Sequence, residues 1–225
     1  MDNKELVAYE GIVPSYRDSI FMPTTDLLKE GAEITLDAIL NDGLLREIPV
    51  VSLLSATAKV IFNVRDRNLL KQTIAFILSF NNGTIKDDVL LKYRETLEND
   101  PKRAAKEIER ITVLLDKTID ELRSRVLAKL YLSYVKGAIS WEKFCELSTA
   151  NSNMFIEDYG ILHALFLNKN TDSLDVNSYH LDRLISLGLA QIIHRYGVVV
   201  KDVEDSKRRE VQLTEFGKAF AQHSR

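Results

Sequence analysis

The chain has 225 residues, of which 45% are hydrophobic and 28% are charged, and its net charge is −3. This composition is that of a globular protein, and it excludes an intrinsically disordered or a collagen-like chain. Nine glycines and four prolines are about half the usual share, so long helices with few loops are expected. The single cysteine excludes an intramolecular disulfide, which fits the expected cytoplasmic location.

The N-terminal part of the chain is expected to be a flexible segment followed by a helical bundle. Residues 1–23 contain Gly11, Pro14 and Pro23 and sustain no apolar period, so we expect this segment to be flexible. Thr24-Thr25-Asp26 then supplies the side chains that cap a helix N-terminus. Apolar residues recur from there at helical spacing, which predicts a bundle over residues 24–138.

The most apolar part of the chain is a predicted helix at residues 48–62. Its stretch without charged residues, from Ile48 to Ala58, has 11 residues, whereas a membrane-spanning helix needs about 20. We therefore expect no stable membrane span and place this helix at the centre of the bundle. A membrane-active effector that inserts residues 48–62 after a conformational change is an alternative.

Residues that typically begin or end helices divide the rest of the bundle. The helix that follows residue 64 is expected to end at Asn81-Asn82-Gly83. Thr84 with Asp87, and Thr118 with Glu121, have the spacing of capping boxes. Asp100-Pro101 begins another helix, because proline is favoured in the first helical turn. The second capping box predicts two helices, instead of one long helix, between residues 102 and 136.

A second module is expected at residues 139–225. Its predicted helices lie at 141–150, 154–167 and 175–187, and they precede predicted strands at 189–195, 198–203 and 210–213. Trp141 and Phe144 are expected to reach back into the bundle. Tyr196-Gly197 can turn between the first two strands, and Thr214 caps a last helix.

Two short motifs in this module resemble the winged helix-turn-helix family. Leu187-Gly188-Leu189 ends a helix before the predicted strands, and Leu213-Thr214-x-x-Gly217 opens the following helix. The resemblance implies that the 175–187 helix enters the major groove of DNA. The residues that would then contact DNA are Asn177, Ser178, Tyr179, His180 and Arg183 at the bases and Lys207, Arg208 and Arg209 at the phosphates.

The charge of this region argues against DNA binding. Residues 171–225 contain eight Lys and Arg and eight Asp and Glu, so their net charge is zero. Phosphate contacts supply most of the non-specific affinity for DNA, and DNA-binding modules are usually basic. We therefore expect this mainly α protein, a helical bundle followed by a winged-helix-like α+β module, to use that module for packing or for protein interaction.

No motif in the sequence predicts catalysis or a cofactor. The chain contains no Gly-x-Ser-x-Gly nucleophile elbow, no phosphate-binding glycine-rich loop and no His-Glu-x-x-His. Its four histidines are too scattered to form a metal site by local spacing. The expectation is a non-enzymatic protein without a metal or cofactor.

The whole chain resembles the Abi-alpha type of bacterial helical proteins, which are associated with abortive phage infection. The resemblance rests on Ile48-Pro-Val-Val51, Arg65-Asp-Arg67 and the helix Leu69–Phe80, together with the two C-terminal motifs above. It implies a bacterial origin and a role in phage defence, and it supplies no catalytic residues. The sequence thus favours a cytoplasmic interaction protein with a protein partner or self-association. A DNA-binding transcriptional regulator and the membrane-active effector are the alternatives.

Overall fold

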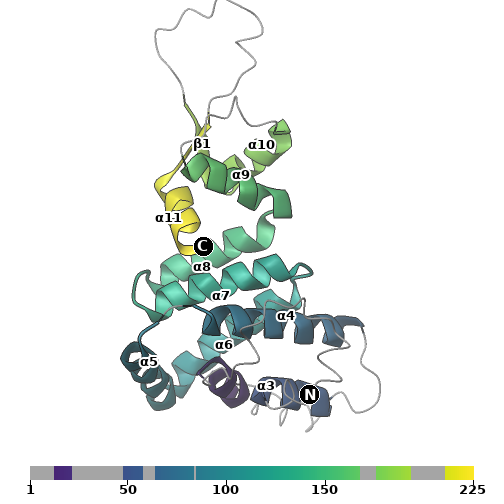
Figure 1. Ribbon diagram of the computed structural model, residues 1–225, viewed down its shortest axis with the longest axis vertical. Helices are drawn as coiled ribbons and strands as arrows, with labels where there is room; N and C mark the ends of the chain where they lie inside the picture. The colour runs from purple at the N-terminus through teal and green to yellow at the C-terminus, as the bar shows by residue number, and fades with distance from the viewer. Residues whose placement is uncertain (1–12, 22–47, 58–63, 84, 168–175, 194–210) are drawn as a thin grey trace, which may run out of the picture. The chain divides into compact units, whose positions relative to one another are not determined.

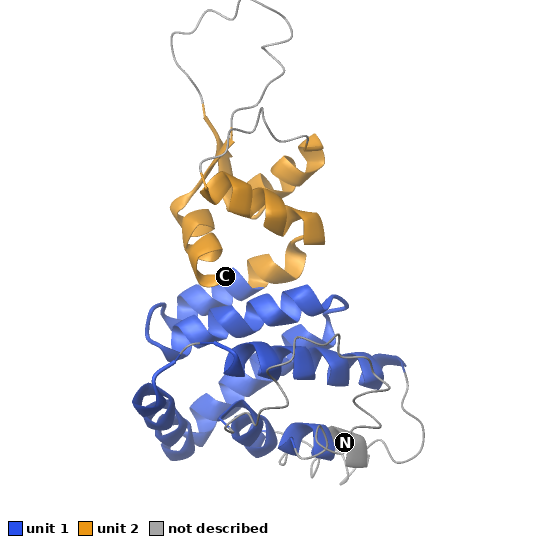
Figure 2. Cartoon of the chain, viewed as in Figure 1, with its two compact units in different colours: residues 1–148 blue, residues 149–225 orange. Residues whose placement is uncertain are grey.

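The computed structural model describes residues 13–21, 48–57, 64–83, 85–167, 176–193 and 211–225 (Figure 1). These residues are mainly α-helical and include one two-stranded sheet, which confirms the predicted mainly α class. The chain forms two compact units, residues 1–148 and residues 149–225 (Figure 2). The predicted helix at 24–40, the strand at 198–203 and Lys207–Arg209 lie outside the described residues.

A helix at residues 13–21 corrects the expected flexibility of the N-terminal segment. Tyr16 and Ile20 are fully buried, and the Tyr16 hydroxyl lies 2.6 Å from Thr73 Oγ1. Ser19 Oγ accepts the backbone N–H of Val50 at 2.9 Å, in the first turn of α3 (Pro49–Thr57). Pro14 interrupts no bond here, because a proline in the first turn of a helix has no intrahelical acceptor to lose.

The core of the N-terminal unit is built around α4 (Val64–Asn81), which contacts α3, α6 and α7. Its buried apolar residues include Leu70, Ile74 and Phe76. Val50 and Val51 of α3 are also buried, but among the described residues α4, and not the helix after Pro49, has the central position. Its apolar side chains point to several neighbours because they occupy more than one face of the helix.

The remaining helices of this unit are α5 (Asp87–Asn99), α6 (Pro101–Asp116) and α7 (Glu121–Val135). Two helices therefore replace one long helix, as predicted. Asp100 caps α6 by accepting the Arg103 N–H at 3.0 Å. The predicted box of Thr118 with Glu121 does not form, because the Thr118 hydroxyl bonds back to Leu114 O at 2.8 Å. Thr84, of the other predicted box, lies outside the described residues.

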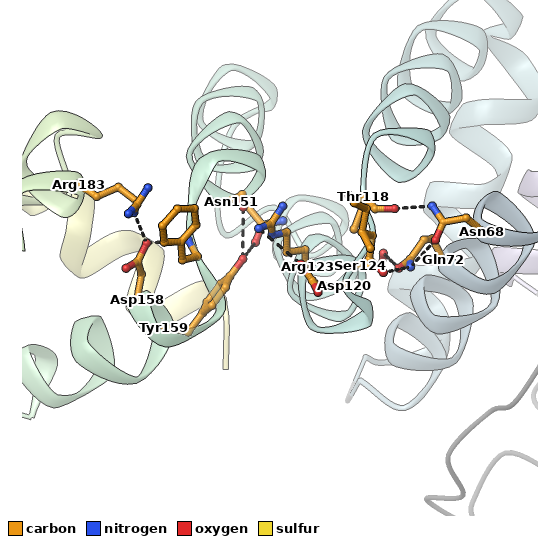
Figure 3. A network of polar contacts seen from close by, with 12 residues as sticks. Asn68, Gln72, Thr118, Asp120, Arg123, Ser124, Asn151, Asp158, Tyr159 and Arg183 are labelled. Carbon is orange, nitrogen blue, oxygen red and sulfur yellow. Dashed lines mark hydrogen bonds and ion pairs between the residues drawn. The ribbon is translucent and has the colours of Figure 1, made fainter. Parts of the chain in front are cut away.

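Two amide side chains of α4 hold the connection between α6 and α7 (Figure 3). Asn68 Nδ2 donates to the carbonyl of Thr118 at 2.6 Å, and Gln72 Nε2 donates to the carbonyl of Ile119 at 2.7 Å. The Ser124 hydroxyl donates to the other end of the Gln72 amide at 2.7 Å. Gln72 is fully buried, so its amide is satisfied within the protein, as buried polar groups require.

The helix α8 (Trp141–Asn153) contains the boundary between the two units. Ser140 caps it by accepting the Lys143 N–H at 3.2 Å. Its first turns belong to the N-terminal unit, since Trp141 and Phe144 pack with ring centroids 5.3 and 6.0 Å from Tyr134. This packing confirms that the two side chains reach into the bundle, and it explains why the boundary falls after Ser148, ten residues beyond the expected 138.

Within the residues that the structure describes, the C-terminal unit continues with three further helices and two strands. These are α9 (Ile156–Phe166), α10 (Ser178–Ser186), β1 (Ala190–Ile192), β2 (Val211–Leu213) and α11 (Glu215–His223). The strands are antiparallel, with Ala190 opposite Leu213 and Ile192 opposite Val211. The first predicted strand thus pairs with the third, and its pairing to residues 198–203 falls outside the described part of the chain.

The motifs Leu-Gly-Leu and Leu-Thr-x-x-Gly form a clasp between the end of α10 and the start of α11. Gly188 has φ +72°, a left-handed conformation that favours glycine. Thr214 Oγ1 donates to the Gly188 carbonyl at 2.6 Å and accepts the Gly217 N–H at 3.0 Å. A Cβ at Gly217 would lie 1.8 Å from the Leu189 carbonyl oxygen. Backbone conformation at Gly188, hydrogen bonds at Thr214 and close packing at Gly217 therefore account for the three residues.

Within the described ranges, no helix is both long enough and apolar enough to cross a membrane.

Candidate interaction site on the C-terminal unit

The residues expected to contact DNA divide into two groups on α10. Asn177, Ser178 and Tyr179, at its N-terminus, are exposed. His180 is buried and Arg183 is half-buried, and both side chains turn toward α9. The structure therefore does not bring the five residues together on one exposed surface.

Asp158 is the common partner of His180 and Arg183, and Figure 3 shows its ion pair with Arg183. Its carboxylate is fully buried. Its Oδ1 lies 2.5 Å from His180 Nδ1, and its Oδ2 lies 2.9 Å from Arg183 Nε. Oδ2 also accepts the backbone N–H of Phe155 at 2.6 Å. The buried carboxylate is thus surrounded by donors, as a charge in a low-dielectric environment requires.

Local helix geometry explains how these groups meet. Asp158 is the third residue of α9, a position from which a carboxylate reaches back to the backbone N–H before the helix. His180 and Arg183 are three residues apart on α10, so they lie on the same face of that helix. Since α9 and α10 are in contact, one face of α10 meets the first turn of α9.

An aromatic row lies over this cluster; we use the name for Phe155, His180 and Tyr179. The Tyr179 ring centroid lies 4.2 Å from that of His180, and the Phe155 centroid lies 6.4 Å from that of His180. The Arg183 guanidinium carbon lies 3.2 Å from the Phe155 ring centroid, a cation–π contact. Tyr179 is 52% exposed and Phe155 is 44% exposed, and the neighbouring Ile156 is 38% exposed. The row therefore presents large apolar side chains to solvent on a fixed base.

A second polar cluster, in the N-terminal unit, is centred on Glu107 of α6. Its buried carboxylate accepts the hydroxyls of Tyr93, Tyr131 and Tyr134 at 2.5, 2.9 and 2.7 Å. Arg103 Nε donates to it at 2.9 Å. Burial raises the pKa of Tyr93, Tyr131 and Tyr134, which keeps the hydroxyls protonated as donors. Every donor comes from the chain itself, so the cluster is a satisfied core network.

The basic residues of α6 also make contacts inside the N-terminal unit. Arg103 donates to the Tyr134 hydroxyl at 2.9 Å. Lys106 Nζ lies 5.8 Å from the Trp141 ring centroid, and Arg110 Nη2 donates to the Cys145 carbonyl at 2.7 Å. These cations hold α6 against its neighbouring helices.

The role of Asp158 is the feature that the sequence does not reveal. Glu157-Asp158 with His163 has the residue types of a metal half-site, but Asp158 bonds to His180 and not to His163. His163 is exposed, and its Nδ1 lies 3.3 Å from Arg225 Nη2. Among the described residues, no group of three or more His, Cys, Asp or Glu side chains is arranged to hold a metal ion. An acidic residue in the first turn of α9 predicts the cap but not its distant partners.

Comparison of the chain with models of protein families, with curated proteins and with solved structures gives no significant match. The contacts of Asp158 and the exposure of the aromatic row are therefore the observations on which a function can be proposed.

Proposed function

We propose that the chain is a non-enzymatic interaction protein that binds a protein partner through the aromatic row and Ile156. The observation that carries this proposal is the exposure of Tyr179, Phe155 and Ile156 over one buried cluster. Exposed apolar side chains that gather at one place are typical of protein-binding surfaces. A second copy of this chain counts as such a partner, because self-association would bury the same side chains.

The support beneath the row favours tight binding. Aromatic residues carry a large share of interface energy because they bury much area and lose little conformational entropy. Here His180 is the buried member of the row, and its Nδ1 lies 2.5 Å from Asp158 Oδ1, which fixes the ring. The Arg183 guanidinium holds one face of Phe155. A surface that is ordered before binding avoids part of the entropic cost of association.

The alternative of a DNA-binding regulator receives less support from the same contacts. His180 and Arg183, the two α10 side chains suited to anionic groups, are both engaged by Asp158. The membrane-active alternative is weakened in a similar way, since Val50 and Val51 are buried in the N-terminal unit. The link to phage defence and the winged-helix assignment belong to this proposal and rest on the sequence resemblances. The cytoplasmic location also belongs to it and rests on the single cysteine.

Site-specific photo-crosslinking tests the proposal. A photoreactive phenylalanine analogue replaces Tyr179 in one sample and Leu91 in the other. Leu91 is a matched control, because it is an apolar residue of α5 that is 60% exposed and lies in the other unit. We expect a discrete cross-linked protein from position 179 only, and an adduct of twice the chain's mass identifies self-association. Equal labelling from both positions, or none from position 179, contradicts the proposal.

A further inference from the structure

The start of α4 lies beside the α6–α7 connection at one end of the N-terminal unit. Arg65 Nε donates to Asp116 Oδ1 at 2.8 Å, and Asn68 Nδ2 donates to the Thr118 carbonyl at 2.6 Å (Figure 3). Both contacts join the first turns of α4 to the chain around the end of α6. Neighbouring side chains of the two segments are therefore held close together.

Three aliphatic side chains at this end project into solvent, and we call Val64, Ile119 and Leu122 the apolar corner. Val64 is 86% exposed and Ile119 is 78% exposed, the two highest fractions among the large hydrophobic residues that the structure describes. Leu122, in the first turn of α7, is 38% exposed. The backbone at Ile119 is fixed, because its carbonyl accepts a hydrogen bond from the buried Gln72 at 2.7 Å. Exposed apolar residues that gather in one place mark a contact with a protein or a membrane.

The charges around the apolar corner are positive on balance. Residues 64–71 and 116–125 contain six Lys and Arg and four Asp and Glu, a net charge of +2, whereas the whole chain has −3. The cations also tend to lie outermost. The Arg65 side chain is 76% exposed, and that of its partner Asp116 is 21% exposed.

Further ion pairs at the corner mostly show the same arrangement. Lys71 and Arg125 are 39% and 49% exposed, whereas Glu121, which both of them contact, is 22% exposed. Asp120 is the exception, because it is more exposed than its partner Arg123. The outer layer around the apolar corner is therefore mainly cationic, and it is complementary to an anionic surface.

We propose that the apolar corner binds the surface of a membrane that contains anionic lipids. Its aliphatic side chains enter the interface, and the surrounding Lys and Arg side chains reach the headgroups. The aliphatic composition favours lipid over a protein partner, because hot spots between proteins are rich in aromatic residues and poor in Leu and Val. The chain lies on the membrane and does not span it. This binding is independent of the aromatic row.

Co-sedimentation of the full chain with vesicles tests the proposal. Vesicles of phosphatidylcholine alone are compared with vesicles of phosphatidylcholine and phosphatidylglycerol, over a range of lipid and salt concentrations. We expect tighter binding to the anionic vesicles, and this binding weakens as salt rises because salt screens exposed charges. No binding to the anionic vesicles at low salt, or equal binding to both kinds, overturns the proposal.

Two matched pairs of variants locate the binding surface. Ile119→Ser and Leu91→Ser each replace one exposed aliphatic side chain, but Leu91 lies on α5, which follows the other end of α4. We expect Ile119→Ser to weaken binding about tenfold and Leu91→Ser to leave it unchanged. Lys117→Gln and Lys92→Gln each remove one exposed cation, and we expect about fivefold weakening from the first alone. Equal losses within either pair overturn the proposal, because binding then depends on total apolar area or on net charge.

A fluorophore at the corner measures insertion directly, and it keeps the test decisive if Ile119→Ser is unstable. A nitrobenzoxadiazole label is attached to Ile119→Cys or to Leu91→Cys. Cys145→Ser in both samples removes the single native thiol. With anionic vesicles we expect a blue-shifted and stronger emission from position 119 and no change from position 91. A change at both positions, or at neither, overturns the proposal.

Discussion

Glu107 in the N-terminal unit and Asp158 in the C-terminal unit are both removed from solvent, but their donors come from different places. Glu107 accepts three tyrosine hydroxyls and one guanidinium, which α5, α6 and α7 supply. Asp158 accepts one backbone N–H, and its other partners are two side chains of α10. The first carboxylate joins three helices, whereas the second fixes one helix face against one helix end.

This difference indicates different roles for the two acids. Glu107 is bonded mostly to neutral hydroxyls, whose removal from water is compensated largely by the carboxylate. Asp158 neutralises a cation that lies near the surface and can return to water. We therefore expect Glu107 to matter most for stability and Asp158 to matter most for what the surface binds.

The largest expected effect comes from Glu107→Ala. The substitution leaves three buried hydroxyls and Arg103 without their common acceptor, and we expect a loss of about 3–5 kcal/mol in the free energy of unfolding. Urea unfolding followed by Trp141 fluorescence reports on this unit, because the chain has a single tryptophan. Glu109→Ala on the same helix is exposed and is expected to change stability by less than about 0.5 kcal/mol. Equal effects of the two substitutions would show that Glu107 has no special role in stability, and the contrast with Asp158 would then fail.

The backbone clasp is expected to matter more for the C-terminal unit than Asp158 does. In Gly217→Ala, the added methyl group would lie 1.8 Å from the Leu189 carbonyl oxygen, and we expect a loss of about 3 kcal/mol. Gly160→Ala in α9 meets no atom within 4 Å and is expected to gain about 0.5–1 kcal/mol. Hydrogen exchange of the Thr214 amide, which bonds to Leu189 O, measures both. An unchanged stability in Gly217→Ala would mean that the backbone around Leu189 moves to accommodate the added methyl group.

Asp158→Asn is expected to cost less than either of these changes, about 1–2 kcal/mol. The amide keeps an acceptor for the Phe155 N–H, and the half-buried Arg183 can reach water. The same amide exchange measurement reports the effect. A loss as large as that of Glu107→Ala would show that Asp158 has a mainly structural role, and the contrast between the two acids would then fail.

Alkaline pH provides a smaller and continuous test of the buried hydroxyls of the N-terminal unit. Burial raises the pKa of Tyr16 from 10.0 to about 12, and it also raises the pKa of Tyr131. Between pH 10 and 12 the unfolded chain loses these protons while the folded chain keeps them, so stability present below pH 10 falls as the pH rises. Tyr16 alone accounts for about 1.4 kcal/mol per pH unit. Trp141 fluorescence should show this slope, and Tyr16→Phe should flatten it by that amount.

Local chemistry predicted many helix ends but not the long-range contacts. Asp100-Pro101 and Thr214 were expected to begin helices, and both do so through side-chain caps. Thr118 was expected to begin α7, yet it closes α6, because a threonine hydroxyl can also bond to the carbonyl four residues before it. The helix at residues 13–21 was missed because its burial depends on Thr73, 57 residues away from Tyr16.

The candidate site was only partly predictable for the same reason. The sequence places His180 and Arg183 on one helix, and their types suit anionic ligands. Their actual partner, Asp158, lies 22 residues before His180, and nothing local distinguishes it from the exposed Glu157 beside it. The aromatic row is equally non-local, since Phe155 reaches the His180 ring, beside Tyr179, only through the packing of α9 on α10.

The α6–α7 connection has a consequence for protein engineering. Surface loops usually accept inserted residues at little cost, and Ile119, which is 78% exposed, marks this connection as an inviting place for a tag or a new chain terminus. Asn68 and Gln72, however, fix the length of this connection, because they donate hydrogen bonds to two successive carbonyls in it. One inserted residue would move a carbonyl out of register and leave the buried Gln72 amide without its acceptor. A peptide tag is therefore better carried elsewhere than at this exposed position.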